Sequence, residues 1–363
     1  MVKRDNIKDF LKKIRALAKP LDQISELTDN ENLAALLRRK YLEEQLGFSL
    51  SATGSSILDF VELENRVSYK PIGAIQIPIT VIGPVEIEGV WNKGEKYIPL
   101  ASIYPALMKA VDLGSKLLSG TKIRLKTQRC WLRLFTISTR QQRIDLCRLV
   151  EDALASTYNL RILCYGRGSG HIINTVMIGD EAPCQQLREI LTDGLIKNVL
   201  FKIEGYMIPV VTPYLNFDIR IIADISKGSL DEFGIEHSLF IETYNTMEDL
   251  RPIDNSLHPI ILGVLSSLYT ALGLKPEYGL RSEIRQHMLA SRFRKIVSTL
   301  EARVSMPIEI RNEELTLMNK ELIQLLRLEE NSPFSLSEIA GVVIMISYTG
   351  LLASIAKEAS RTY

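Results

Sequence analysis

The sequence predicts an α+β fold, with a large mixed α/β domain and a small ferredoxin-like α+β domain inserted into it. Three observations lead to this prediction. Apolar residues recur at a helical period near the N-terminus, and segments rich in Ile, Val and Pro, typical of strands, follow. From Arg129 to Gly205 the pattern then alternates strand, helix, strand, helix, strand, as expected of a small module placed between two segments of a larger domain.

The individual elements follow from the same patterns. Before residue 129 we expect helices over 6–18 and 32–46, the second ended by Gly47, strands within 72–98 with turns at Gly83-Pro84 and 92–94, and a helix over 100–118. Within the inserted module we expect strands over 131–138, 160–165 and 200–203 and helices over 140–156 and 180–193. After it we expect strands over 215–225 and 239–243, and then mostly helices.

These elements predict a division into three parts. Residues 1–50 form an N-terminal helical segment. Residues 51–128 and 207–363 form the large domain, and residues 129–206 form the small inserted domain.

Composition bounds the class of protein. The chain has 363 residues, of which 46% are hydrophobic, and this is enough to fill sizeable cores. Its 44 basic and 43 acidic residues leave a formal charge of +1, without a long run of either sign. This balance gives no electrostatic footprint for nucleic acid or for an anionic membrane, so a small molecule or another protein is the expected partner.

The cysteines and the apolar stretches indicate the cellular compartment that we expect for the protein. The four cysteines lie far apart in the sequence, at Cys130, Cys147, Cys164 and Cys184. Because none shares a C-x-x-C spacing, we expect reduced thiols in a cytoplasmic protein. The uncharged stretches Leu257–Leu274 and Ile339–Ala356 are expected to be two buried helices rather than membrane spans.

Six short motifs stand in one order along the chain. They are Arg38–Glu43 (RRKYLE), Ile72–Pro84 (IGAIQIPITVIGP), Ile98–Ser102 (IPLAS), Asn216–Phe217 (NF), Leu268–Gly273 (LYTALG) and Ser305–Ile310 (SMPIEI). Together they resemble motifs of the 3-hydroxy-3-methylglutaryl-coenzyme A (HMG-CoA) reductase family. The resemblance implies that family's fold, with a large domain that binds the coenzyme A thioester and dimerises and a small nucleotide-binding domain. It also implies its reaction, the reduction of a thioester to an alcohol by two hydride transfers from NAD(P)H.

The resemblance also implies where the family's catalytic Glu, Lys, Asp and His should stand. The Glu position is occupied by Tyr104, two residues after the IPLAS motif, and the Lys position by Val210. Lys275 occupies the Asp position and reverses its charge, and the sequence runs out at Tyr363, one residue before the family's His. We therefore expect no intact catalytic residue.

Binding positions are retained in part. Arg129 matches the family's arginine that pairs with the carboxylate of the substrate, a task that suits a bidentate guanidinium; an ordinary structural arginine is the alternative. For the cofactor, the resemblance implies that Gly168, Ser169, Gly170 and Asn174 stand at binding positions. The glycine-rich stretch could cradle a phosphate with its amides, or it is a plain flexible turn.

The leading hypothesis is a pseudoenzyme, a non-catalytic partner or regulatory subunit, in the context of mevalonate and isoprenoid metabolism. It would form a homo-oligomer, or a hetero-oligomer with an active reductase paralogue, and no cofactor is expected. A sensor that still binds a coenzyme A thioester or a nucleotide is the first alternative. The second is an active NADPH-dependent reductase with relocated catalytic groups, for example Tyr104 and Lys275.

Overall fold

The structure is a computed structural model. It describes residues 4–15, 20–28, 31–51, 77–102, 104–138, 162–167, 172–178, 184, 186–187, 210–249, 257–274, 276–292, 297–309, 317–328 and 333–361. The chain divides into two compact units. One contains Met1–Ile77 and Glu314–Leu325, and the other contains Pro78–Glu313 and Leu326–Tyr363. The three-part division expected from the sequence stays a prediction.

The first unit is helical. Its elements are α1 (Arg4–Arg15), α2 (Pro20–Gln23), the 3-10 helix η1 (Ile24–Leu27), α3 (Glu31–Leu46) and α13 (Leu317–Leu325). A small apolar core joins the N-terminal elements, formed by Ile14, Ile24, Ala34, Leu37 and Tyr41. Gly47 has a φ of +75° and its N–H donates to the carbonyl of Glu43 at 2.9 Å, so α3 ends where the sequence predicts.

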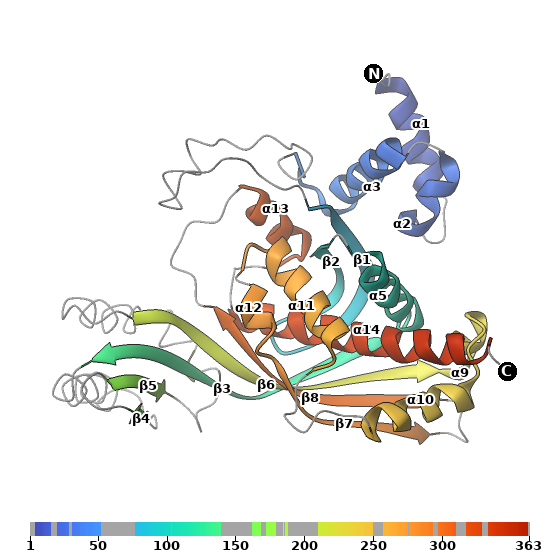
Figure 1. The fold of residues 1–363 in the computed structure, drawn as a ribbon. Helices are drawn as coiled ribbons and strands as arrows, with labels where there is room; N and C mark the ends of the chain where they lie inside the picture. The colour runs from blue at the N-terminus through green and yellow to red at the C-terminus, as the bar shows by residue number, and fades with distance from the viewer. Residues whose placement is uncertain are drawn as a thin grey trace. The chain divides into compact units, whose positions relative to one another are not determined.

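The second unit is built on one mixed sheet (Figure 1). Its strands are β1 (Ile79–Glu88), β2 (Lys93–Ala101), β3 (Lys122–Ser138), β4 (Ile162–Arg167), β5 (Ile172–Ile178), β6 (Val210–Ser226), β7 (Glu283–Arg292) and β8 (Val297–Glu309). Six of them lie in the order β2-β1-β3-β6-β8-β7, and β5 pairs with β3 and with β4. Only β1 and β3 are paired in parallel; the other pairs are antiparallel. The structure thus confirms the predicted mixed α/β class.

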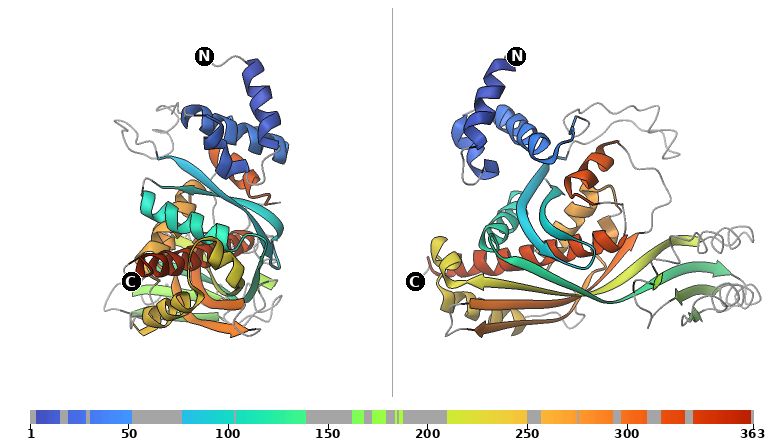
Figure 2. Two further views of the ribbon diagram at one scale, coloured as in Figure 1. Left: turned by 90° about the vertical axis from the view of Figure 1, so that its right-hand side faces the viewer. Right: turned by 180° about the vertical axis from the view of Figure 1, so that it is seen from behind.

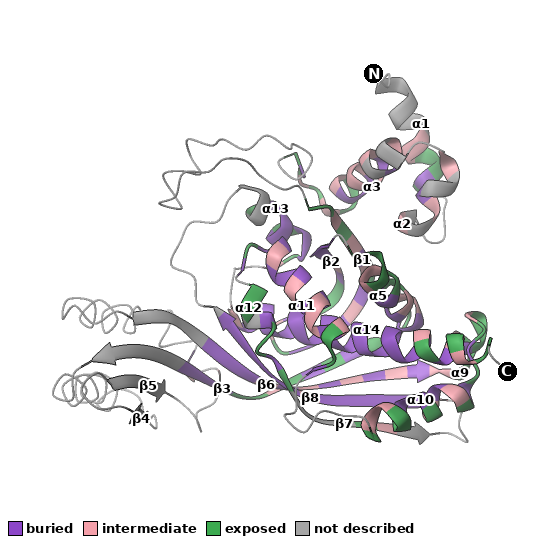
Figure 3. Ribbon diagram, viewed as in Figure 1, coloured by how far each residue is buried: buried purple, intermediate pink, exposed green. Residues whose placement is uncertain are grey.

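Helices cover one face of this sheet. The helices of the unit are α5 (Pro105–Leu117), α9 (Lys227–Glu232), α10 (His237–Asp249), α11 (Pro259–Ala271), α12 (Pro276–Gly279) and α14 (Pro333–Ala359). Figures 1 and 2 show α5, α11 and α14 on the same side of the strands. The side chains of β6 that point to this side are fully buried apolar residues: Leu215, Phe217, Ile219, Ile221, Ala223 and Ile225. The core of the unit therefore lies between α14 and the sheet (Figure 3).

The helix α14 is the one described helix long and apolar enough to cross a membrane. However, 89% of its most apolar window is buried inside the protein. Together with α11 it confirms the expectation that the two uncharged stretches are buried helices. Its length and composition are therefore weak evidence for a membrane span.

Several expected elements were wrong. Residues 239–243 were expected to be a strand but belong to α10, because the buried His237, Phe240 and Tyr244 recur at helical spacing. The expected helix over 100–118 begins only at Pro105, since Leu100 and Ala101 complete β2. The region after 243 was expected to be mostly helical but contains β7 and β8, and β5 was not expected at all.

The expectation of reduced, unpaired thiols was also wrong for two cysteines. Cys130 in β3 and Cys184 form a disulfide, with their Cα atoms 5.3 Å apart and a sequence separation of 54. Sequence spacing cannot reveal such a pair, because the fold alone brings the two positions together. The expected elements over 140–156 and 200–203 lie outside the described residues, and of the expected helix over 180–193 only 184 and 186–187 are described, as helix, so the ferredoxin-like character of the inserted part stays a prediction.

Candidate functional site

Tyr104 lies at the start of α5, directly after the end of β2. It is the N-cap residue, with Pro105 in the first helical position, and its backbone N–H donates to the Ser102 hydroxyl at 3.1 Å. Its side chain is 64% exposed. The local sequence thus turns the chain sharply from strand to helix and leaves the phenol at the surface.

Arg129 lies on β3 at a register irregularity, and it is exposed on the face of the sheet opposite to the helices. Its cross-strand partner is Asp218 on β6, and Trp131 is paired with Asn216. Paired residues share a face, and so do residues two apart on one strand, so Arg129 and Asn216 lie on the same face of adjacent strands. The structure therefore brings together two positions that resemble the family's motifs.

Asn216 is fixed in place. It is buried, and its side-chain amide donates to the hydroxyl of Ser305 on β8 at 2.8 Å. An amide held in this way presents one defined orientation, which suits the recognition of a polar group. One of the two N–H donors of the Asn216 amide is therefore already bonded within the protein.

Val210 and Asn174 are placed in one cross-strand row, on either side of Thr136 in β3. This row is seven residues along β3 from Arg129, which corresponds to about 23 Å of extended strand. The proposed substrate-binding arginine is thus well separated from the proposed cofactor-binding asparagine. The side chains of Val210 and Asn174 lie outside the described residues, as do Gly168, Ser169, Gly170 and Lys275 altogether.

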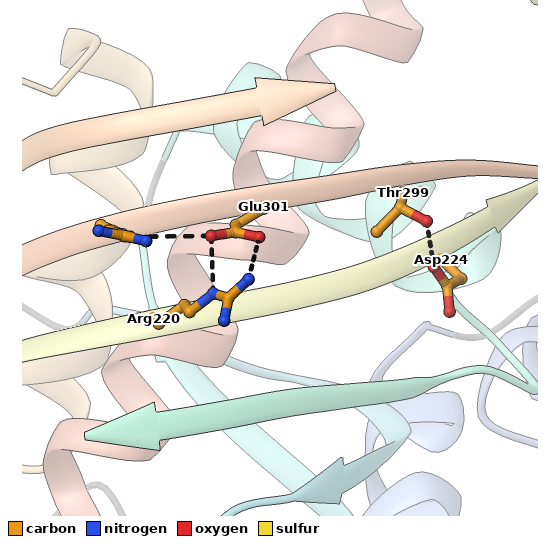
Figure 4. A network of polar contacts seen from close by, with 5 residues as sticks. Arg220, Asp224, Thr299 and Glu301 are labelled. Atoms are coloured by element: carbon orange, nitrogen blue, oxygen red, sulfur yellow. Dashed lines mark hydrogen bonds and ion pairs between the residues drawn. The ribbon is translucent and has the colours of Figure 1, made fainter. Parts of the chain in front are cut away.

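A network of charged side chains occupies the same face of the sheet as Arg129 (Figure 4). Arg220 donates to both carboxylate oxygens of Glu301, with Nε–Oε1 and Nη2–Oε2 distances of 2.7 and 2.6 Å, and Arg303 Nε lies 3.7 Å from Oε1. The hydrogen bond from Glu301, and then its charge, raise the pKa of Arg220 above its ordinary value. Glu301 thus holds two guanidiniums of neighbouring strands together.

A second part of this network involves Asp224. Its carboxylate accepts from the Thr299 hydroxyl at 2.6 Å and from Arg124 Nη2 at 2.9 Å. Sequence reasoning missed both parts, although the alternation of charged and apolar residues in 218–224 is a signal for a sheet with one polar face. The network joins β3, β6 and β8, and in it three guanidiniums share two carboxylates.

Two histidines have structural partners. His237 is buried, and its Nε2 lies 2.8 Å from the Ser298 hydroxyl. His258 is the N-cap of α11, where its Nδ1 accepts from the N–H of Ile260 at 3.3 Å, and burial lowers the pKa of His258 below its ordinary value. Among the described residues, no group of three or more His, Cys, Asp or Glu side chains could hold a metal ion.

Comparisons with known proteins agree with this architecture. Residues 34–140 match the family model of hydroxymethylglutaryl-coenzyme A reductase. The chain is 42% identical over 110 residues to a 3-hydroxy-3-methylglutaryl-coenzyme A reductase of Aeropyrum pernix, covering 30% of this chain and 26% of that protein. A reductase of Pyrococcus abyssi is 38% identical over 115 residues, covering 31% of this chain and 28% of that protein. The chain thus matches little more than a quarter of the length of these relatives.

Solved structures extend the likeness in fold over most of the chain. A 3-hydroxy-3-methylglutaryl-coenzyme A reductase of Streptococcus pneumoniae has a TM-score of 0.56 at 13% identity, covering 88% of this chain and 96% of that one. A class II reductase of the same organism, solved with NADPH in open conformations, has a TM-score of 0.55 at 13% identity, covering 92% of this chain and 98% of that one. At this identity the likeness shows the fold alone.

The fold is therefore that of the solved hydroxymethylglutaryl-coenzyme A reductases over most of the chain. More narrowly, residues 34–140 are homologous in sequence to the hydroxymethylglutaryl-coenzyme A reductases. The sequence relationship is carried by residues 34–140, the stretch that contains the N-terminal motifs, Tyr104 and Arg129.

Proposed function

We propose that this chain is a non-catalytic member of the reductase family, a pseudoenzyme that acts as a partner or regulatory subunit. One observation carries the proposal. The motif ending in Ser102 places Tyr104 at the position expected for the family's catalytic glutamate. Tyr104 lies within residues 34–140, the stretch that matches the family model, and this supports the proposal.

The substitutions remove the chemistry that a thioester reduction needs. A phenol is by its reference chemistry a much weaker acid than a carboxyl group, so it is a poor replacement for a glutamate as proton donor. The register expected from the sequence also places Val210, which has no group to stabilise an oxyanion, at the lysine position, and Lys275 at the aspartate position. Loss of one oxyanion donor costs about 10² to 10³ in rate, and loss of a general acid about 10² to 10⁴.

A partner role follows because the scaffold persists over nearly the whole chain while these positions are changed. In this proposal the chain assembles in the cytoplasm, in a homo-oligomer or with an active reductase paralogue, in mevalonate and isoprenoid metabolism. Residues 51–128 and 207–363 form its large domain and residues 129–206 its small one. Co-purification with an active reductase supports the partner role, whereas a homo-oligomer that does not bind such a reductase contradicts it.

The structure gives limited support to cofactor binding. Of the proposed cofactor-binding residues it describes only Asn174, whose strand β5 is paired with β3 on one side and β4 on the other. Its backbone is thus committed to the sheet and forms no cradle for a phosphate. Gly168, Ser169 and Gly170 lie outside the described residues, so NADPH binding at this place stays a prediction and we propose no step that uses it.

A residual sensor of a coenzyme A thioester is a second candidate, and the adjacency of Arg129 and Asn216 favours it. Thermal-shift measurements with coenzyme A, the acyl thioester and NADPH test this role. A shift with the thioester that Arg129→Gln removes supports a sensor, and the absence of any shift excludes it. Lys126→Gln, three residues before Arg129 on the same strand, is a matched control for the loss of one positive charge.

The decisive experiment is an assay of purified protein for thioester-dependent oxidation of NADPH or NADH. We expect no turnover above a no-protein control. Turnover that Tyr104→Phe abolishes would instead establish an active reductase with relocated catalytic groups. An active family member assayed in parallel controls for the substrate and the cofactor.

A further inference from the structure

The disulfide between Cys130 and Cys184 has no part in the function proposed above. Cys130 is fully buried in β3, one residue after Arg129, and its cross-strand partner on β6 is Phe217. Phe217 in turn makes an edge contact with Phe334 of α14, with ring centroids 5.4 Å apart. The disulfide is therefore anchored at its Cys130 end in the rigid core of the sheet unit.

The 54-residue loop that the disulfide closes contains β4 and β5. The backbone of β5 is paired with β3 from Leu132 to Ser138, so this pairing starts two residues beyond Cys130. The strands β4 and β5 are thus held to β3 in two ways, by a backbone ladder along its second half and by a covalent bond at the start of that ladder. Only the covalent bond can be broken without unfolding the sheet.

The two cysteines differ in exposure. Cys130 is 0% exposed, whereas Cys184 is partly exposed. A reductant thiolate can therefore attack only the Cys184 sulfur, which forms a mixed disulfide at Cys184 and releases the Cys130 thiolate, which takes up a proton. A second reductant thiol then attacks the mixed disulfide. The reductant leaves as its own disulfide, and the two electrons and two protons it gives up leave Cys130 and Cys184 as thiols.

We propose that Cys130–Cys184 is a reversible redox site, operated by small thiols of the glutathione class, that controls how often β4 and β5 open away from β3. In the oxidised form the closed loop restricts local unfolding of these strands. In the reduced form the backbone ladder between β5 and β3 still opposes it, without the covalent bond. The burial of Cys130 also favours re-formation of the disulfide, because its thiol stays in place to attack a mixed disulfide at Cys184.

Hydrogen exchange of the full chain tests the proposal. We expect backbone amides of β4 and β5 to exchange at least about tenfold faster after treatment with a dithiol reductant than after oxidised glutathione, while amides of β8 stay unchanged. Cys184→Ser should exchange at the fast rate under both conditions. Cys147→Ser, which leaves the pair intact, should keep the difference.

Alkylation followed by peptide mass spectrometry gives an independent readout. In mixtures of reduced and oxidised glutathione the pair should pass from thiols to disulfide as the oxidised share rises. A pair that stays oxidised in excess reduced glutathione is a permanent structural bond, and one that stays reduced in oxidised glutathione is only a close contact; either result overturns the proposal, as do equal exchange rates in both states. If Cys184→Ser fails to fold, Cys130→Ala replaces it in the same comparison.

Discussion

Gly114 of α5 and Gly350 of α14 cross with their backbones in contact. A Cβ atom built on Gly350 would lie 1.7 Å from the carbonyl oxygen of Ala110, and one built on Gly114 would lie 2.0 Å from that of Ile346. No other residue type fits at either position without moving a helix. This crossing sets how closely α5, and with it Tyr104 at its start, approaches the central helix.

Gly350→Ala should destabilise the protein by about 1–3 kcal/mol, because the added methyl group meets backbone atoms that cannot rotate away. This loss outweighs the gain of roughly 1 kcal/mol that alanine brings to a helix interior. Urea unfolding followed by circular dichroism measures it. Gly341→Ala on the same helix is the control, since its Cβ would meet only the ends of the Leu125 and Ile221 side chains, at 3.0 and 3.2 Å. Equal effects of the two substitutions would contradict the close crossing.

Glu338 of α14 holds the turn between β1 and β2. Its fully buried carboxylate accepts from the backbone N–H groups of Val90, Trp91 and Asn92 and from the Asn92 side chain, at 2.7–3.1 Å. Glu338→Leu leaves these donors without an acceptor, at a cost of about 1–3 kcal/mol for each that stays buried. We expect a large drop in the urea midpoint. Glu358→Leu, on the exposed end of the same helix, should change it little.

The same carboxyl predicts a pH dependence. Burial raises the pKa of Glu338 above its ordinary value of 4.5, although the hydrogen bonds from the turn oppose this shift. The folded state therefore binds the proton more tightly than the unfolded state, and the stabilisation is present below the ordinary pKa and is lost as the pH rises through the raised one. The difference in free energy of unfolding between the natural protein and Glu338→Gln, which does not titrate, should fall as the pH rises above about 4.5. A difference that grows with pH would show that the hydrogen bonds dominate.

Glu301 is expected to offset the repulsion in a row of three cations. The register places Lys126, Arg220 and Arg303 side by side on β3, β6 and β8, and Glu301 bonds two of them. Glu301→Gln should cost about 1–3 kcal/mol, and less at high salt, where the repulsion among the cations is screened. Unfolding at low and at high salt measures this. Glu358→Gln removes an ion pair in which both side chains are mostly exposed, so it should leave stability nearly unchanged.

Local signals in the sequence predicted part of the fold. The helix α3 and its end at Gly47 depend on near neighbours alone, and so does the turn into α5 at Pro105, whose start the sequence placed five residues too early. The strand β8 was missed although Leu300, Ala302 and Val304 alternate with polar residues in the manner of a half-buried strand. The strand β7, by contrast, has no regular alternation of apolar and polar residues.

The candidate site was predictable to a different extent. The motif that ends in Ser102 predicted Tyr104 as a site position, which stays a prediction, and only the structure showed that this residue is exposed. Likewise, Arg129 and Asn216 were separate motif residues until the antiparallel pairing of β3 and β6 put them on one face. The charges around Glu301 escaped notice because their partners are on other strands.

The sequence by itself was enough to predict the resemblance to the reductase family and the mixed α/β class, since these depend on residue types and their order, while the assignment of Tyr104 to the glutamate position stays a prediction. Tertiary structure alone decided which distant groups meet: Glu338 with a turn 246 residues before it, and Cys130 with Cys184 across 54 residues. The physical reason is that hydrogen bonds, ion pairs and disulfides act over a few ångströms, and only the folded sheet and its helices bring these groups within that range.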